Sequence, residues 1–344
     1  MFKNLSKTFK RVLITGGAGF IGSNLVKTLL KDKNLFLVNL DKISYSSDLK
    51  GQLELEKENP NNFKFIKTDL FNEIETRNII DFYKPDLVIH LAAESHVDRS
   101  LINPRNFLES NTIGTFNLLE GSRNYWEKLS INKKEIFKFI HVSTDEVFGS
   151  LKNEGKFSEN SSYKPSSPYS ASKAASDHFV FAWNKTFKMP TIITNCSNNY
   201  GPKQFPEKLI PLTILKIIRN SSIPVYGNGQ NIRDWLFVDD HINALMLIAH
   251  NGQPGKRYCI GGNNEISNLE LIKLICKVLD TKITRDKNSF ELVKFVRDRP
   301  GHDYRYSIDS NLINKELSWE PKTSLSLGIE KTIDWYLNNL NWCE

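Results

Sequence analysis

The sequence contains little that would mark an exported, membrane-bound or metal-binding protein. Its four cysteines, Cys196, Cys259, Cys276 and Cys343, have neither a metal-binding nor a redox spacing, so we expect reduced and mostly buried thiols. No apolar run is long enough to span a bilayer, and the basic N-terminal stretch lacks the apolar core of a secretion signal. An organelle transit peptide is not expected, because the first strand pattern begins almost at once. These absences predict a cytoplasmic protein without membrane attachment or a bound metal.

Charge of one sign does not gather in any block of the sequence. The 46 Lys and Arg residues outnumber the 39 Asp and Glu residues, which leaves a net charge of +7 spread along the chain. We therefore expect no nucleic-acid-binding arm, whereas a small anionic substrate fits the charge. The composition, 40% hydrophobic and 25% charged, is that of an ordinary globular protein, and 344 residues suffice for one large α/β unit and a smaller lobe.

A glycine-rich turn follows the first predicted strand, Arg11–Thr15. Gly16, Gly19 and Gly22 have a spacing that lets the backbone turn tightly, approach a pyrophosphate and enter a helix whose N-terminus attracts anions. The second predicted strand ends at Asp41, which is placed to accept hydrogen bonds from a ribose diol. This order of elements indicates a dinucleotide site that prefers NAD to NADP, because an acid there disfavours a 2′-phosphate. The alternative is a packing turn in some other α/β protein.

Predicted strands and helices alternate through the first two hundred residues. This alternation predicts an α/β fold with a doubly wound parallel (Rossmann) sheet, in which ligands bind beyond the carboxyl ends of the strands. We expect residues 1–200 to form mainly the NAD-binding domain and residues 201–344 mainly a smaller substrate-binding lobe, with segments around 236–262 returning to the first domain. The other predicted strands are 36–40, 63–67, 87–91, 137–142 and 191–195, and the predicted helices include 74–82, 107–126, 169–186, 238–250 and 269–279.

One predicted strand leads directly into Thr144, Asp145 and Glu146, and a predicted helix then opens with Tyr169 and Lys173. Residues four apart share one helical face, and a lysine ammonium beside a phenol lowers the pKa of the phenol. Tyr169 is therefore a candidate general base near neutral pH, and the two carboxylates are a second acid/base pair. Both patterns have plainer explanations, since Tyr-x-x-x-Lys occurs often by chance and two acids can end a strand in solvent. The independent dinucleotide signature favours the catalytic interpretation.

Several other polar residues have no single interpretation. His96 and Asp98 are interpreted as loop residues to which no chemistry is assigned. Arg233 and Arg297 lie in polar loops where a guanidinium could bind a diphosphate, but Arg233 could equally form an ion pair with Asp234.

Over essentially its whole length the sequence resembles the nucleotide-sugar branch of the extended short-chain dehydrogenase/reductase superfamily, and within it the dTDP-glucose 4,6-dehydratases. The glycine turn and the Tyr-x-x-x-Lys motif are common to the superfamily, whereas the Thr-Asp-Glu triplet at 144–146 separates dehydratases from epimerases. The other stretches that carry the resemblance are 41–45, 91–100, 111–115, 167–173, 194–202, 204–211, 233–235 and 298–303.

The resemblance implies contacts with the cofactor NAD and with a nucleotide-diphosphate sugar, dTDP-glucose. The residues implied to hold NAD, together with the three glycines of the turn, are Phe20, Ile21, Asp41, Lys42, Ser44, Asp69, Leu70, Leu91, Ala92, Ser95, Thr112, Tyr169, Lys173 and Asn198. The residues implied to surround the nucleotide sugar are Ser95, Thr144, Asn198, Lys208, Leu209, Pro224, Tyr226, Arg233, Asn268, Arg297, Asp298, Arg299, Pro300, Gly301 and His302.

The resemblance also implies a dehydration of the sugar, to dTDP-4-keto-6-deoxyglucose and water, as in deoxysugar biosynthesis. Tyr169 would take the proton of the sugar 4-hydroxyl while hydride leaves C4 for NAD, and Thr144 would hydrogen-bond the resulting oxygen. Glu146 would then remove the C5 proton and Asp145 would protonate the departing 6-hydroxyl, before hydride returns to C6. The alternatives are a dehydratase for UDP- or other NDP-sugars, an epimerase or decarboxylase of the same superfamily, and a catalytically silent NAD-binding protein.

Two features depart from the family pattern. The family usually has Tyr where this chain has Phe148, and the loop Ser150–Phe157 is atypical and slightly basic. We expect both to affect the rim of the cleft and the substrate preference.

Helices 107–126 and 169–186 carry more apolar residues than one sheet face needs, among them Phe179, Val180, Phe181 and Trp183. We expect these helices to meet their counterparts in a homodimer, which the resemblance also implies.

Overall fold

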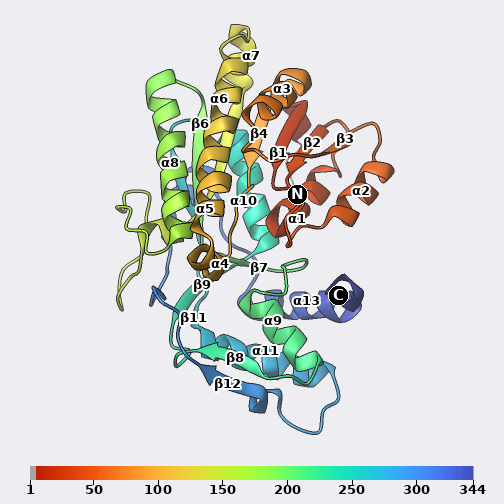
Figure 1. The fold of residues 1–344 in the computed structure, drawn as a ribbon, viewed down its shortest axis with the longest axis vertical. Coiled ribbons are helices and arrows are strands. Elements are labelled where there is room, and N and C mark those ends of the chain that lie inside the picture. Colours follow the sequence, from red (N-terminus) through yellow and green to blue (C-terminus); the bar gives the residue numbers. More distant parts are fainter. Residues whose placement is uncertain (1–4, 344) are drawn as a thin grey trace.

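Seven parallel strands form the central sheet of the larger lobe, which is the upper part of the molecule in Figure 1. The computed structural model describes residues 5–343, so residues 1–4 and 344 of the predicted domain ranges lie outside the described part. The order of the strands is β10-β6-β5-β4-β1-β2-β3, and it reverses direction between β1 and β4, where α/β sheets bind ligands. The strands are β1 (Arg11–Thr15), β2 (Phe36–Asp41), β3 (Phe63–Lys67), β4 (Leu87–His90), β5 (Lys138–Thr144), β6 (Thr191–Cys196) and β10 (Arg257–Ile260).

Helices cover both faces of this sheet, which is why its strands are nearly continuous apolar runs. Successive residues of a strand point to opposite faces: Val12 packs in one core cluster with α1 and α10, whereas Leu13 packs in another with α3, α6 and α8. The helices of the larger lobe are η1 (Leu5–Lys7), α1 (Phe20–Leu29), α2 (Leu49–Glu58), α3 (Glu73–Tyr83), α4 (Val97–Ile102), α5 (Pro104–Phe107), η2 (Leu108–Ile113), α6 (Gly114–Trp126), α7 (Ile131–Ile136), η3 (Asp145–Phe148), α8 (Pro168–Phe187) and α10 (Val238–Asn251).

The smaller lobe has two short sheets packed against helices and a separate core cluster. One sheet joins β7, β9 and β11, and the other pairs β8 with β12 in parallel. Within residues 5–343, no helix is long and apolar enough to cross a membrane. The elements of this part of the chain are β7 (Asn198–Tyr200), α9 (Leu209–Ile218), β8 (Ile223–Tyr226), β9 (Ile232–Phe237), β11 (Glu265–Ser267), α11 (Asn268–Lys282), η4 (Ser289–Leu292), β12 (Val293–Val296), α12 (Asn311–Leu317), α13 (Leu325–Asn338) and η5 (Leu340–Cys343).

The chain returns twice from the smaller lobe to the larger one. First, α10 packs in the core beneath the sheet and β10 pairs with β6 as its edge strand. Second, α12 and the segment after it contribute Ile313, Leu317 and Trp319 to the same core, and the Trp319 indole donates a hydrogen bond to the Asp240 carbonyl (3.2 Å). The predicted division of the chain included the first return but not the second. Its boundary at residue 200 stays a prediction.

The long helical pattern predicted for 107–126 is interrupted in the structure. A π-helical turn, η2, separates α5 from α6 and directs Asn111 towards the end of β4. There Asn111 Oδ1 accepts a hydrogen bond from the Glu94 amide (2.8 Å), and its Nδ2 donates to the Ser172 hydroxyl (2.9 Å). The interruption therefore ties the strand end to α8.

The apolar residues of α8 divide between the core and the surface. This corrects the expectation that Val180 and Trp183 are apolar residues beyond those needed to cover one face of the sheet. Val180 is fully buried in the core cluster on the opposite face of the sheet from α10, and Trp183 packs edge-on against Phe116 with ring centroids 5.7 Å apart. Phe181 is exposed. Of Val180, Phe181 and Trp183, Phe181 is therefore the residue available for a contact with another molecule.

The glycine turn between β1 and α1 is packed against backbone. Gly16 has φ +76°, and a β-carbon there would lie 2.5 Å from the Ala92 amide nitrogen. A β-carbon at Gly22 would lie 2.1 Å from the Gly16 carbonyl oxygen, whereas at Gly19 the nearest atom would be 3.4 Å away. Close approach of β1, α1 and the end of β4 thus requires glycine at positions 16 and 22.

We expect Gly22→Ala to lower the free energy of unfolding by about 1–3 kcal/mol or more, because the backbone that meets the new methyl group cannot move aside. Urea unfolding measures the change. Gly19→Ala is the matched control and should change the stability by less than about 0.5 kcal/mol, since its methyl group fits. Equal losses in the two variants would show that the close approach at Gly22 does not decide the packing.

Candidate active site

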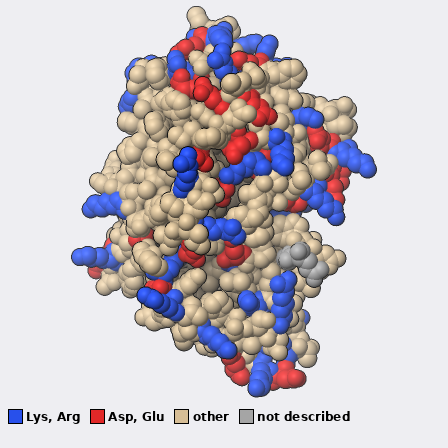
Figure 2. Space-filling view, viewed as in Figure 1, with Lys and Arg blue, Asp and Glu red and all other residues tan. Residues whose placement is uncertain are grey.

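One cavity opens at the carboxyl ends of β1, β2, β4, β5 and β6, between the two lobes. Figure 2 shows a hollow across the middle of the molecule, with basic and acidic side chains gathered around it. Sixteen residues predicted to hold NAD line this cavity, so residues from far apart in the sequence converge on it. They are Gly16, Gly19, Phe20, Ile21, Gly22, Asp41, Lys42, Ser44, Asp69, Leu70, Leu91, Ala92, Ser95, Tyr169, Lys173 and Asn198.

The end of the cavity beside the glycine turn has the features of a dinucleotide site. The N-terminus of α1 has no side-chain cap, so its amides are open to an anion, and the glycines leave no side chain in the way. Asp41 accepts hydrogen bonds from the amides of Ala18 (3.0 Å) and Ile43 (2.8 Å), which fix its carboxylate at the strand end. Burial raises the pKa of Asp41, and these hydrogen bonds oppose the rise. The residues present therefore fit NAD.

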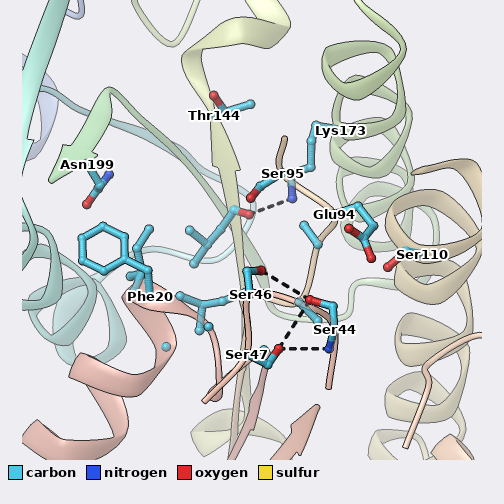
Figure 3. A pocket seen from close by; sticks show the side chains of 18 of the residues that line it. Phe20, Ser44, Ser46, Ser47, Glu94, Ser95, Ser110, Thr144, Lys173 and Asn199 are labelled. Atoms are coloured by element: carbon cyan, nitrogen blue, oxygen red, sulfur yellow. Dashed lines mark hydrogen bonds between the residues drawn. The ribbon is translucent and has the colours of Figure 1, made fainter. Parts of the chain in front are cut away.

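The chemical groups meet at the opposite end, where β5 runs into η3. Figure 3 shows Thr144 and Lys173 at this end and the linked serines Ser44, Ser46 and Ser47 at the other. The Thr144 hydroxyl accepts a hydrogen bond from the Glu146 amide (3.2 Å) and so turns both acids into the cavity wall.

Helix α8 brings Tyr169 and Lys173 to the same wall. A capping box between Ser167 and Ser170 and a proline at the first turn start the helix at this point. The Lys173 ammonium donates a hydrogen bond to the Val142 carbonyl (2.9 Å), which joins α8 to β5. The predicted acid/base residues lie together in one site, because all of them line the same cavity: Thr144, Asp145, Glu146, Tyr169 and Lys173.

The two carboxyl groups have different electrostatic surroundings. Burial raises the pKa of Asp145 well above its usual range, and the negative charges of Glu146 and Asp234 raise it further. Burial also raises the pKa of Glu146, but the nearby Arg299, Arg233 and Lys208 oppose that rise. Asp145 is thus suited to hold a proton and Glu146 to accept one.

The pKa of Tyr169 differs from the sequence-based prediction. Burial raises it well above 10, and the charge of Glu146 adds to the increase. Lys173 directs its ammonium at a backbone carbonyl, and burial lowers its own pKa to about 8. The four-residue spacing correctly predicted that both side chains enter one site, but not that burial would decide the pKa of the phenol.

Comparison with known proteins gives a consistent result. The sequence model of the family described as GDP-mannose 4,6 dehydratase matches residues 13–332. A probable dTDP-glucose 4,6-dehydratase of Sinorhizobium fredii is 50% identical over 332 residues, which cover 96% of this chain and 94% of that protein. A dTDP-glucose 4,6-dehydratase of Escherichia coli is 48% identical over 345 residues, which cover 96% of this chain and 95% of that protein.

The chain belongs to the dTDP-glucose 4,6-dehydratase family. Its fold is also that of the family. The dTDP-glucose 4,6-dehydratase of Streptomyces venezuelae, solved with NAD and TYD bound, superimposes with a TM-score of 0.88. Its sequence is 36% identical, and the match covers 97% of this chain and 99% of that one. A UDP-glucose 4-epimerase of Thermotoga maritima superimposes with a TM-score of 0.84 at 25% identity, and the match covers 96% of this chain and 99% of that one. Dehydratases and epimerases thus share this architecture.

The residues implied to surround the nucleotide sugar form two groups. Ser95, Thr144, Asn198 and Lys208 line the cavity, and the Lys208 ammonium donates a hydrogen bond to the Ser95 carbonyl (3.0 Å). The others are not among the lining residues within the described part of the chain, and their contacts with substrate stay predictions. They are Leu209, Pro224, Tyr226, Arg233, Asn268, Arg297, Asp298, Arg299, Pro300, Gly301 and His302.

Arg233 does not form the alternative ion pair with Asp234. Its buried guanidinium donates to the carbonyls of Ile232 (2.8 Å) and Asp303 (2.9 Å) and lies 4.3 Å from the centre of the Tyr306 ring. Asp234 instead accepts hydrogen bonds from the amides of Gly262 and Asn264. The contact predicted between Arg233 and a diphosphate stays open.

Thr112 and Phe148 do not line the cofactor cavity, and the loop 150–157 is only partly buried. The Thr112 hydroxyl donates to the Ser172 carbonyl (3.2 Å), and the residue lines a separate groove beside α8 instead of the cofactor cavity. Phe148 is buried and stacks on Tyr163, with ring centroids 5.6 Å apart. The loop pairs through Phe157 with the strand-like segment around Ile308, and Phe148 and Phe157 belong to one small core, whereas residues 152–156 are exposed. The effect of this loop on the cleft rim and on substrate preference stays a prediction.

Sequence reasoning missed several charged residues at the cavity. Glu94 lines it and forms an ion pair with Lys42 (2.7 Å), and Glu207 lines it beside Lys208. The position of Glu94 just after a strand end was a usable signal. Asp98 contacts Tyr226 and Arg299, and Arg99 contacts Tyr45 and Glu207.

We expect the protein to bind NAD at least about tenfold more tightly than NADP, because a 2′-phosphate would meet the carboxylate of Asp41. Equilibrium titration with the two cofactors measures the ratio. Asp41→Ala should weaken NAD binding and bring the two affinities together. Equal affinities for NAD and NADP in the unaltered protein would contradict the role given to Asp41.

Proposed function

We propose that this protein is an NAD-dependent dTDP-glucose 4,6-dehydratase, which converts dTDP-glucose to dTDP-4-keto-6-deoxyglucose and water. The observation that carries the proposal is the presence of Asp145 and Glu146 in the same cavity as Tyr169 and Lys173. Relatives named for this reaction, about half of whose residues are identical to those of this chain, support it. Dimerisation and a cytoplasmic location are further proposals, argued from the sequence and the surface of the molecule.

NAD, when bound, accepts hydride from C4 of the sugar and returns it to C6, so the net redox change is zero. The glycine turn and Asp41 would hold its adenosine end, and Tyr169 and Lys173 lie at the other end of the cavity. Solved relatives contain NAD, which supports this assignment.

Tyr169 would remove the proton of the sugar 4-hydroxyl, with the Thr144 hydroxyl as hydrogen-bond donor to the oxygen as it becomes a carbonyl. Since burial raises the pKa of Tyr169, its phenolate needs a compensating positive charge. Lys173, one turn further along the same helical face, supplies that charge when it is protonated.

Glu146 and Asp145 would then carry out the elimination. The 4-ketone makes the C5 proton acidic, and Glu146, whose negative charge is stabilised by three nearby cations, removes it. Asp145, whose pKa burial raises so that its protonated form is favoured, would donate its proton to the departing 6-hydroxyl. Glu146 later returns a proton to C5. An epimerase has no need of this second acid/base pair, so the pair favours dehydration over epimerisation.

Deuterium placed at C4 of dTDP-glucose should appear at C6 of the product, because the hydride that leaves C4 returns within one closed site. NMR of the product locates the label. Recovery of the label at C4 would indicate epimerase chemistry and would overturn the proposal. UDP-glucose under the same conditions tests the alternative nucleotide.

Variants separate the two stages of the same reaction. Glu146→Gln should slow turnover by roughly 10²–10⁴-fold and should abolish exchange of the C5 proton with solvent, while removal of hydride from C4 continues. Tyr169→Phe should already block the first stage, so that the label stays at C4 of unchanged substrate. Full turnover by Glu146→Gln would show that this carboxylate has been assigned wrongly.

A homodimer is also part of the proposal. Helix α8 and the turn η2 border an apolar groove, whose walls include Leu108, Ile113 and Ala171. Leu108 is 54% exposed, and Phe181 lies exposed further along α8. Exposed apolar residues along two adjacent helices are typical of an isologous interface, in which the same face of two copies meets.

Leu108→Glu should convert the dimer to a monomer at micromolar concentration, because the interface would bury a charge without a partner. Light scattering gives the mass. Phe82→Glu is the matched control, since Phe82 is an exposed apolar residue on α3 away from this groove, and it should leave the dimer intact. A monomeric unaltered protein would contradict the proposal.

A further inference from the structure

Helix α4 carries two adjacent charged residues, Asp98 and Arg99, that contact different segments around the cleft. The helix follows β4 and lies between the two lobes (Figure 1). Asp98 contacts the smaller lobe, whereas Arg99 contacts both Tyr45 in the loop after β2 and Glu207 at the start of the smaller lobe. Because both residues belong to one six-residue helix, movement of either contact displaces the other.

Asp98 binds two residues that the resemblance assigns to the nucleotide sugar. Its Oδ1 accepts a hydrogen bond from Arg299 Nη1 (3.1 Å), and its Oδ2 accepts one from the Tyr226 hydroxyl (3.3 Å). Tyr226 ends β8, and Arg299 lies in the loop after β12. This side of α4 therefore contacts the predicted substrate loops.

Arg99 binds a cluster beside the predicted cofactor site. Its guanidinium lies 3.5 Å from the centre of the Tyr45 ring, and its Nε lies 3.5 Å from Glu207 Oε2. The Tyr45 hydroxyl donates a hydrogen bond to Glu207 Oε1 (2.8 Å), and the edge of Phe205 packs on the Tyr45 ring. The cation is attracted to the face of the aromatic ring, and the carboxylate attracts the cation and accepts a hydrogen bond from the phenol, so each contact stabilises the others.

This cluster closes one side of the cavity. Tyr45 lies within the serine loop 44–47, three residues of which line the cavity, and Phe205 and Glu207 line it from the start of the smaller lobe. The hydrogen bond between Tyr45 and Glu207 thus bridges two segments 162 residues apart in the sequence. The bridge therefore joins the serine loop to the smaller lobe beside the cavity.

We infer that α4 acts as a clasp that couples occupancy of the nucleotide-sugar site to retention of the cofactor. The clasp consists of Tyr45, Asp98, Arg99 and Glu207, and its residues are positioning residues that do not take part in the chemistry. A nucleotide that engages Arg299 and Tyr226 fixes Asp98, and the same helix then holds Arg99 on Tyr45. The inference rests on the proposed function, in which the cofactor must stay bound from the first hydride transfer to the second.

Coupling between two sites is reciprocal and can be measured without turnover. The probes are NADH, whose fluorescence reports its own release into excess NAD, and dTDP, which has no sugar to react. In the unaltered protein, saturating dTDP should slow the release of NADH by about tenfold, within the range of ordinary coupling energies. Release that is equally fast with and without dTDP would overturn the inference.

Two variants locate the coupling in α4. Asp98→Ala should leave the release rate without dTDP nearly unchanged, but should reduce the effect of dTDP to less than about twofold. Arg99→Met should speed release under both conditions, because the contact with Tyr45 and Glu207 is lost. Arg77→Met is the matched control: the Arg77 side chain, on α3, is 54% exposed and that of Arg99 is 51% exposed, so removing either exposes a similar surface.

If Asp98→Ala keeps the full effect of dTDP, or if Arg99→Met releases NADH as slowly as Arg77→Met, α4 is not the clasp. These outcomes are independent of catalysis. A protein that shows the coupling but forms no 4-keto-6-deoxy sugar would refute the proposed function alone, and a dehydratase without the coupling would refute the clasp alone.

Discussion

The hydrogen bond from the Lys173 ammonium to the Val142 carbonyl fixes the distance between α8 and β5, and the geometry of the site depends on that distance. Thr144, Asp145 and Glu146 come from the end of β5, whereas Tyr169 comes from the start of α8. The helix start is fixed independently by the Ser167 capping box. Two separate constraints, one at the helix terminus and one a turn later, therefore hold the phenol beside the Thr144 hydroxyl, which is the kind of preorganisation that catalysis requires.

Burial of charge is the second constraint on the site. Several ionisable side chains share a region from which water is largely excluded, and their interactions with one another decide which of them carry protons. Burial, together with the negative charges of Glu146 and Asp234, raises the pKa of Asp145, whereas the cations around Glu146 oppose the rise in pKa that burial causes there. The arginines and lysine of the smaller lobe thus take part in setting the protonation state of a residue in the larger lobe.

The sequence was informative wherever a feature has a local pattern. The bounds predicted for β1 and β3 agree with the structure, and α8 begins within one residue of the predicted position. The glycine turn, Asp41, Tyr169 and Lys173 line one cavity because strand ends meet at one edge of a parallel sheet.

What the sequence did not reveal depends on residues that are distant along the chain. Asp98 meets Tyr226 and Arg299 across separations of 128 and 201 residues, and no local spacing encodes such contacts. The pKa of Tyr169 depends on burial by the completed fold. The packing of Phe148 against Tyr163 likewise depends on a loop whose course has no periodic signal. Residue types and spacing thus indicate the chemistry of the site, whereas its electrostatics and the connections between lobes come from tertiary structure.

The return of Trp319 to the core beneath the sheet has a consequence for biosynthesis. The first two hundred residues contain six of the seven strands, but β6 lacks its neighbour β10, and the sheet face that α10 and Trp319 cover is open until those segments emerge from the ribosome. At roughly 5–20 residues per second, the remaining 119 residues up to Trp319 take about 6–24 s to synthesise. During that time the nascent chain presents an unpaired strand edge and an apolar surface, which are the features that chaperones recognise and that lead to aggregation.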